Sequence, residues 1–162
     1  MLALKVLIFV ILVPGTVAGW VPYWLSRWPT GLPALELGAW RHIGWLLLVP
    51  GIAVLLWSVW EFASEGQGTP APIDPPKRFV ATGMYRYVRN PMYVGVLSAV
   101  VGQALLYESW NVLIYAAILW GVVHAFVVFY EEPTLRRLFG DQYAAYCGSV
   151  PRWIPRRPAN RP

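Results

Sequence analysis

Cysteine, histidine and charged residues are all scarce in this chain of 162 residues. Its single cysteine, Cys147, excludes an internal disulfide, and no metal site is predicted. Charged residues make up 13% of the chain, whereas soluble domains usually carry about a quarter. The scarcity of charge therefore argues against a soluble domain.

Apolar and aromatic side chains are abundant instead, with 57% hydrophobic residues and ten Trp. This composition indicates a membrane protein, and the chain is too short for a large soluble domain beside its spans. We predict an all-α integral membrane bundle of four transmembrane helices with a short cytoplasmic C-terminal helical tail. It forms one domain over residues 1–162, with spans over 2–25, 43–60, 91–107 and 110–130.

The first apolar run allows two interpretations. It is interrupted by Pro14-Gly15, and Thr16-Val17-Ala18 resembles the cleavage site of a signal peptide. Because apolar residues continue past that site to Leu25, we prefer a retained and kinked span. A cleaved signal peptide is the alternative.

The longest polar segment runs from Glu61 to Thr82 and contains Pro70, Pro72, Pro75 and Pro76. Prolines at that density do not allow a long helix, so we expect an extended connector along the surface.

The third span begins at a motif rich in polar and aromatic residues. Pro91 suits a first helical position, and Asn90 before it is a good N-cap, so an anionic group is favoured there. An aromatic belt with a basic flank is the alternative explanation of this stretch. Gly95, Ala99 and Gly102 form a small-residue face, which we expect to pack on Gly121 and Ala125 of the fourth span.

Two groups of motifs, at residues 77–95 and 130–155, lie in the second half of the chain. The first reads Gly83/Tyr85 and Arg89-Asn90-Pro91/Tyr93/Gly95; the second reads Glu131-Glu132/Leu135, Phe139-Gly140/Tyr143/Tyr146 and Val150-Pro151. In this order they resemble the integral-membrane methyltransferases related to isoprenylcysteine carboxyl methyltransferase and phospholipid N-methyltransferase. The first half of the chain carries no motif of that family.

The resemblance implies S-adenosyl-L-methionine as cofactor and a lipophilic acceptor that enters from the bilayer. Arg89 and the helix N-terminus suit the cofactor's carboxylate, and Glu131 or Glu132 suits its ammonium or ribose. The expected cofactor-binding residues are Lys77, Arg78, Phe79, Val80, Tyr85, Arg89, Asn90, Pro91, Met92, Tyr93 and Glu131. A catalytically silent four-span scaffold is the alternative.

The reacting groups are less defined. Methyl transfer needs positioning and exclusion of water more than a strong acid or base. If the acceptor is an amine, it must lose a proton, and Glu131, Glu132 and His124 are the candidates to take it. His124 is equally well explained as a neutral residue hydrogen-bonded between helices.

The acceptor is open between the carboxylate of a prenylated cysteine, the amine of a phospholipid headgroup and another hydrophobic metabolite. The isoprenylcysteine enzymes associate an arginine four residues before the first glutamate with the substrate carboxylate, where this chain has Val127. This difference favours the amine.

Basic residues predict the orientation. With four spans, eleven of the thirteen Lys and Arg residues fall on the side of the motifs, and only Arg27 and Arg41 on the other. Positive residues favour the cytoplasmic side, so we expect the N-terminus, the cofactor site and the C-terminus there, in an inner or plasma membrane. No nucleic-acid partner is expected, and the oligomeric state is not predicted.

Overall fold

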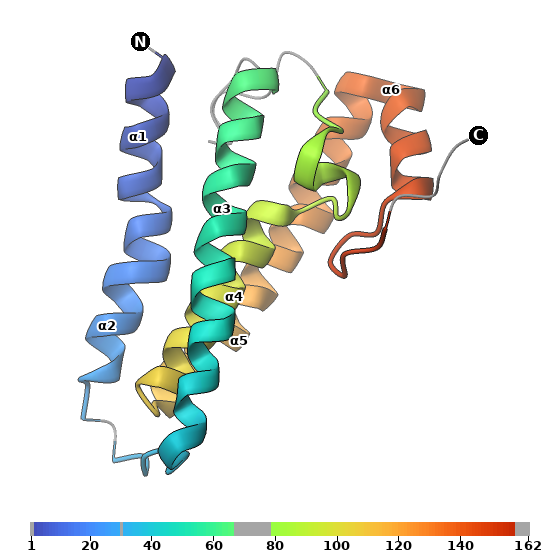
Figure 1. The fold of residues 1–162 in the computed structure, drawn as a ribbon. Coiled ribbons are helices and arrows are strands. Elements are labelled where there is room, and N and C mark those ends of the chain that lie inside the picture. Colours follow the sequence, from blue (N-terminus) through green and yellow to red (C-terminus); the bar gives the residue numbers. More distant parts are fainter. Residues whose placement is uncertain (1, 30, 67–78, 158–162) are drawn as a thin grey trace.

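The computed structural model describes residues 2–29, 31–66 and 79–157, and these contain helices but no strands. Three helices are long and apolar enough to cross a membrane, over Val6–Ser26, Gly38–Glu65 and Trp110–Ser149. A shorter apolar helix, α4, covers Pro91–Leu106. Figure 1 shows the N-terminus, the end of α3 and α6 at one end of the bundle. The turn between α4 and α5 (Trp110–Phe126) lies at the other end. Because the described residues contain helices and no strands, the all-α prediction is confirmed.

The first run is helical, and its irregular turn lies just after the predicted Pro14-Gly15 break. It consists of α1 (Leu2–Leu12), a π turn (Thr16–Trp20) and α2 (Val21–Ser26). Pro22 has no N–H for the carbonyl of Ala18, and the Val21 N–H donates to Thr16 instead of Val17. Side chains of the bundle replace these donors: Gln103 Nε2 donates to Ala18 O at 2.6 Å, and Tyr115 OH to Val17 O at 2.9 Å.

The second span is longer than predicted. A 3-10 turn (Gly38–Ile43) leads into α3 (Gly44–Gly66), which continues six residues beyond Trp60. Part of the expected connector, Glu61 to Gly66, is therefore helical, and that part of the prediction was wrong. A tertiary contact explains it, because Glu61 Oε2 accepts a hydrogen bond from Met84 N at 2.8 Å and holds the end of α3. The prolines of the connector lie outside the described residues.

The small-residue face of α4 packs on α3, not on the fourth span. A Cβ added at Gly95 would lie 2.7 Å from Gly51 O, and one at Gly102 would lie 2.7 Å from Gly44 O. A Cβ at Gly121 would meet nothing within 4 Å. The predicted partner was wrong because sequence spacing identifies a small face but not the helix that fills it.

The helix of the predicted fourth span continues past Tyr130 as far as the break at Gly140. α5 (Trp110–Phe126) continues through a π turn (Val127–Glu131) into α6 (Glu132–Ser149). Pro133 lies inside this rod, and the π turn just before it accommodates the missing N–H. Gly140 breaks the rod, with φ +49°, and the second half of α6 turns back beside the first half (Figure 1).

Candidate functional site

The predicted site gathers at the N-terminus of α4. Pro91 occupies the first helical turn, as predicted, and is buried, and Met92 beside it is half-buried. The Asn90 side chain does not cap the helix; its Nδ2 donates to Arg152 O at 3.1 Å. Asn90 thus occupies the predicted N-cap position, but the predicted capping by its side chain was wrong, because the C-terminal segment supplies a carbonyl close to it.

Glu131 meets α4 directly. Tyr93 OH donates to Glu131 Oε2 at 3.1 Å, which joins the first turn of α4 to the π turn after α5. Tyr85 belongs to a 3-10 turn (Gly83–Arg86) and is buried. Burial raises the pKa of Tyr85 well above its usual value, and the Glu131 carboxylate raises it further, so this phenol stays neutral. Tyr85, Tyr93 and Glu131, three of the predicted residues, thus interact with one another.

Glu132 has a different environment, between two guanidinium groups. Arg89 Nη1 lies 2.8 Å from Glu132 Oε1, while Arg152 donates from Nε to Oε1 at 2.7 Å and from Nη2 to Oε2 at 2.9 Å. The hydrogen bond to Glu132 raises the pKa of Arg152, so its charge persists at every physiological pH. The Glu132 side chain is only 8% exposed. Both carboxylate oxygens are engaged, so Glu132 acts as the link between two cations.

Arg89 retains one polar atom without a partner. Its Nη1 contacts Glu132 and also Cys147 Sγ, at 3.1 Å, but its buried Nε has no hydrogen-bond partner among the described residues. An unsatisfied buried donor is costly. A carboxylate at this position, such as the one that the predicted cofactor carries, fits the unpaired N–H and the start of α4.

The C-terminal segment is part of the site. Arg89 N donates to Pro151 O at 2.9 Å and Arg156 N to Tyr87 O at 3.0 Å, so residues 151–156 run beside the motif of α4. Trp153 Nε1 donates to His124 Nδ1 at 3.1 Å. That nitrogen of His124 is thus occupied as an acceptor, and the π turn between His124 and Glu131 shifts the helical phase that would place both on one face.

Phe79 and Val80 belong to the packing of the tail. The Phe79 ring lies 5.4 Å from Phe139 and 5.0 Å from Tyr146, and Val80 is buried. Tyr146 OH donates to Tyr85 O at 2.7 Å, which ties this aromatic cluster to the site. The structure thus places Phe79 in the aromatic packing of α6, apart from the polar groups of the site. Lys77 and Arg78 lie outside the described residues.

Two residues that support the site were absent from the predicted set. Arg152 was passed over although it directly follows the Val150-Pro151 motif, and its position there is the only local signal for it. Glu61 holds the 3-10 turn through Met84 N and accepts from Trp57 Nε1 at 2.6 Å. The spacing of Trp57 and Glu61, four residues apart on one helix face, is the only local signal for it.

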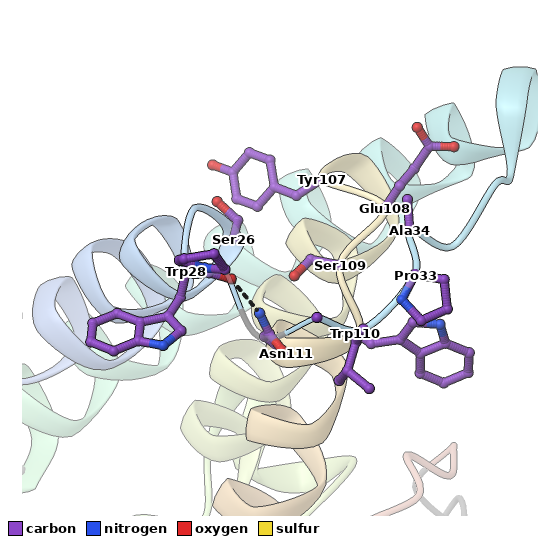
Figure 2. Close-up of a pocket in the computed structure, with 12 residues that line it drawn as sticks. Ser26, Trp28, Pro33, Ala34, Tyr107, Glu108, Ser109, Trp110 and Asn111 are labelled. Carbon is purple, nitrogen blue, oxygen red and sulfur yellow. Dashed lines mark hydrogen bonds between the residues drawn. The ribbon is translucent and has the colours of Figure 1, made fainter.

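A hollow of about 230 Å³ lies at the opposite end of the bundle, beside Trp28 and the α4–α5 turn (Figure 2). Glu108 at that turn has φ 51° and accepts hydrogen bonds from the N–H groups of Leu37 and Gly38. These bonds fasten the loop before α3 to the turn. None of the predicted site residues lines this hollow.

Comparison with known proteins identifies the same region. The family model described as phospholipid methyltransferase matches residues 40–142. The protein-S-isoprenylcysteine O-methyltransferase B of Arabidopsis thaliana is 34% identical over 79 residues, which are 48% of this chain and 40% of that protein. The protein-S-isoprenylcysteine O-methyltransferase of Schizosaccharomyces pombe is 38% identical over 77 residues, 47% of this chain and 32% of its own. The match spans less than half the length of these relatives.

Proposed function

Because the chain belongs to the phospholipid methyltransferase family, we propose that it is a membrane methyltransferase that uses S-adenosylmethionine to methylate a lipophilic acceptor. The observation that supports this most is the buried Nε of Arg89, which has no hydrogen-bond partner within the described ranges. The Tyr93–Glu131 hydrogen bond joins the same motif to the second one. Both features lie inside the segment that the family shares.

Each predicted residue then has a distinct task. Arg89 Nε and the first turn of α4 bind the carboxylate of the cofactor, because both present N–H donors at a positive helix end. Glu131 binds the ammonium or ribose, and Tyr93 orients it. Asn90, Pro91 and Met92 shape this turn. Lys77 and Arg78, which lie outside the described residues, stay predicted cofactor contacts.

The chemistry asks little of these groups. S-adenosylmethionine supplies a methyl group that its sulfonium has already activated. The protein has to align the acceptor and exclude water. A carboxylate acceptor needs no base, whereas an ammonium must lose a proton. In that case Glu131 is the base we favour, because Glu132 is held by Arg89 and Arg152.

We place the site on the cytoplasmic side of a four-span bundle, with α4 as the shortest span. At 1.5 Å per residue its 16 residues reach about 24 Å, less than the hydrocarbon core of about 30 Å. The start of α4 therefore lies below the membrane surface, where an apolar acceptor reaches it from the bilayer. The distribution of basic residues supports this orientation.

Titration calorimetry on the purified full chain in detergent tests the proposal. We expect S-adenosylmethionine to bind, and Glu131→Gln to weaken binding at least about tenfold through loss of a charged hydrogen-bond acceptor. Glu36→Gln is the matched control, because Glu36 is exposed at the other end of the bundle. A folded protein that does not bind the cofactor would favour the scaffold alternative.

A further inference from the structure

The π turn between α5 and α6 lies at a defined depth. The rod from Trp110 to the break at Gly140 has about 30 residues and is about 45 Å long, more than the hydrocarbon thickness of about 30 Å. If Trp110 marks one interface, about 20 residues of helix cross the hydrocarbon, so the rod leaves it near Phe129 and Tyr130. Arg137 lies two turns further on, at the level of the lipid headgroups.

A groove of about 240 Å³ opens on the outer face of this part of the rod. It is lined by Phe129, Tyr130, Pro133, Thr134 and Arg137. Phe129 is 81% exposed, and the Tyr130 ring stacks on Phe126 at 5.1 Å. The apolar wall and the cation are thus arranged along the membrane normal, in the order of an acyl chain and a phosphate.

The backbone of the same turn offers hydrogen-bond acceptors. Glu132 N donates to Val127 O, and Pro133 has no N–H. Val128 O therefore accepts a backbone hydrogen bond from neither residue. Pro133 also cannot donate to Phe129 O. The π turn of the first helix has the same defect, and there Gln103 and Tyr115 supply the donors.

In the described ranges, no side chain donates a hydrogen bond to a carbonyl of the second π turn. Arg137 likewise has no carboxylate within ion-pair distance in the part of the chain that the structure describes. A ligand for this groove needs an anion for Arg137 and an apolar chain for Phe129.

We propose that this groove binds one anionic phospholipid of the surrounding leaflet, with its phosphate on Arg137 and its chain on Phe129. Burial of the chain and a charge-assisted hydrogen bond both contribute to binding. Because none of the lining residues belongs to the predicted cofactor-binding set, the inference does not rest on methyl transfer.

Native mass spectrometry of the full chain in detergent, titrated with dioleoyl phosphatidylglycerol, tests the proposal. We expect one lipid to bind before the others, with dioleoyl phosphatidylcholine at least about tenfold weaker. Arg137→Gln should lower the affinity for phosphatidylglycerol by a similar factor. Arg157→Gln, at an exposed arginine outside the groove, should leave it unchanged.

Two further variants separate the groove from general attraction to the membrane. Phe129→Ala should weaken phosphatidylglycerol binding, whereas Ile118→Ala should not, although Ile118 is 61% exposed on the same helix. Thermal unfolding without lipid checks that each variant is folded.

Equal affinities for all variants would overturn the proposal and leave an ordinary aromatic belt with basic residues. Displacement of the lipid by millimolar inorganic phosphate would also overturn it, because the groove would then be a site for free anions.

Discussion

Arg152 holds both carboxylate oxygens of Glu132, through Nε at 2.7 Å and Nη2 at 2.9 Å. This fork joins the C-terminal segment to the start of α6, and Arg89 extends it to α4. The tail after Gly140 therefore closes the candidate site instead of trailing from the last span.

Loss of this fork should be felt at the cofactor. Arg152→Gln leaves Glu132 with Arg89 alone, so Arg89 is drawn away from the cofactor carboxylate. We expect the dissociation constant for S-adenosylmethionine to rise about tenfold in calorimetry. Arg152→Lys keeps the charge but loses the two-point contact with Glu132. Its affinity for S-adenosylmethionine should lie between those of the unmodified protein and Arg152→Gln. Affinity unchanged in Arg152→Gln would show that the fork is structural only.

The effect of the Tyr93–Glu131 hydrogen bond on cofactor affinity can be separated from the contribution of a tyrosine hydrogen bond to stability. Tyr93→Phe should lower cofactor affinity several-fold, because Glu131 loses the donor that orients it. Tyr115→Phe removes a hydrogen bond to Val17 O elsewhere in the bundle. It should reduce thermal stability but not affinity. Equal affinity losses in both would indicate a shared folding defect.

Packing of α3 on α4 predicts unequal tolerance at two glycines. Gly95→Ala places a methyl group 2.7 Å from Gly51 O, so the helices must separate, at a cost of about 1–3 kcal/mol. Gly121→Ala meets nothing within 4 Å. Thermal unfolding in detergent should show a lower midpoint for the first variant and little change for the second.

Labelling with an impermeant maleimide tests the orientation. In a Cys147→Ser background, a cysteine at Arg157 should react only after cells are opened, because basic residues favour the cytoplasmic side. A cysteine at Glu36 should react in intact cells. The reverse pattern would contradict the cytoplasmic cofactor site.

Acceptor preference follows from Val127, which is fully buried one turn before Glu131 and offers no charge. A substrate carboxylate there would lack a cation, a loss of about 1.5–3 kcal/mol. We therefore expect phosphatidylethanolamine to accept labelled methyl groups better than acetylated farnesylcysteine. Efficient turnover of the latter would show that another arginine has taken this role.

The sequence alone determined the features that depend on local chemistry. Apolar composition predicts a helical membrane bundle, and Pro91 predicts the start of α4. Each of these features depends on the backbone restriction of one residue or on a run of hydrophobic residues, and both can be read from residues that are close in the sequence.

Only the tertiary structure decided which groups meet. Asn90 bonds to a carbonyl 62 residues away instead of capping its own helix, and Glu131 and Glu132, adjacent in sequence, turn to Tyr93 and to two arginines. The small face of α4 found α3 rather than the next helix. Such choices depend on packing between distant segments and on the phase that a π turn introduces, and neither is encoded in the spacing of residues along one helix.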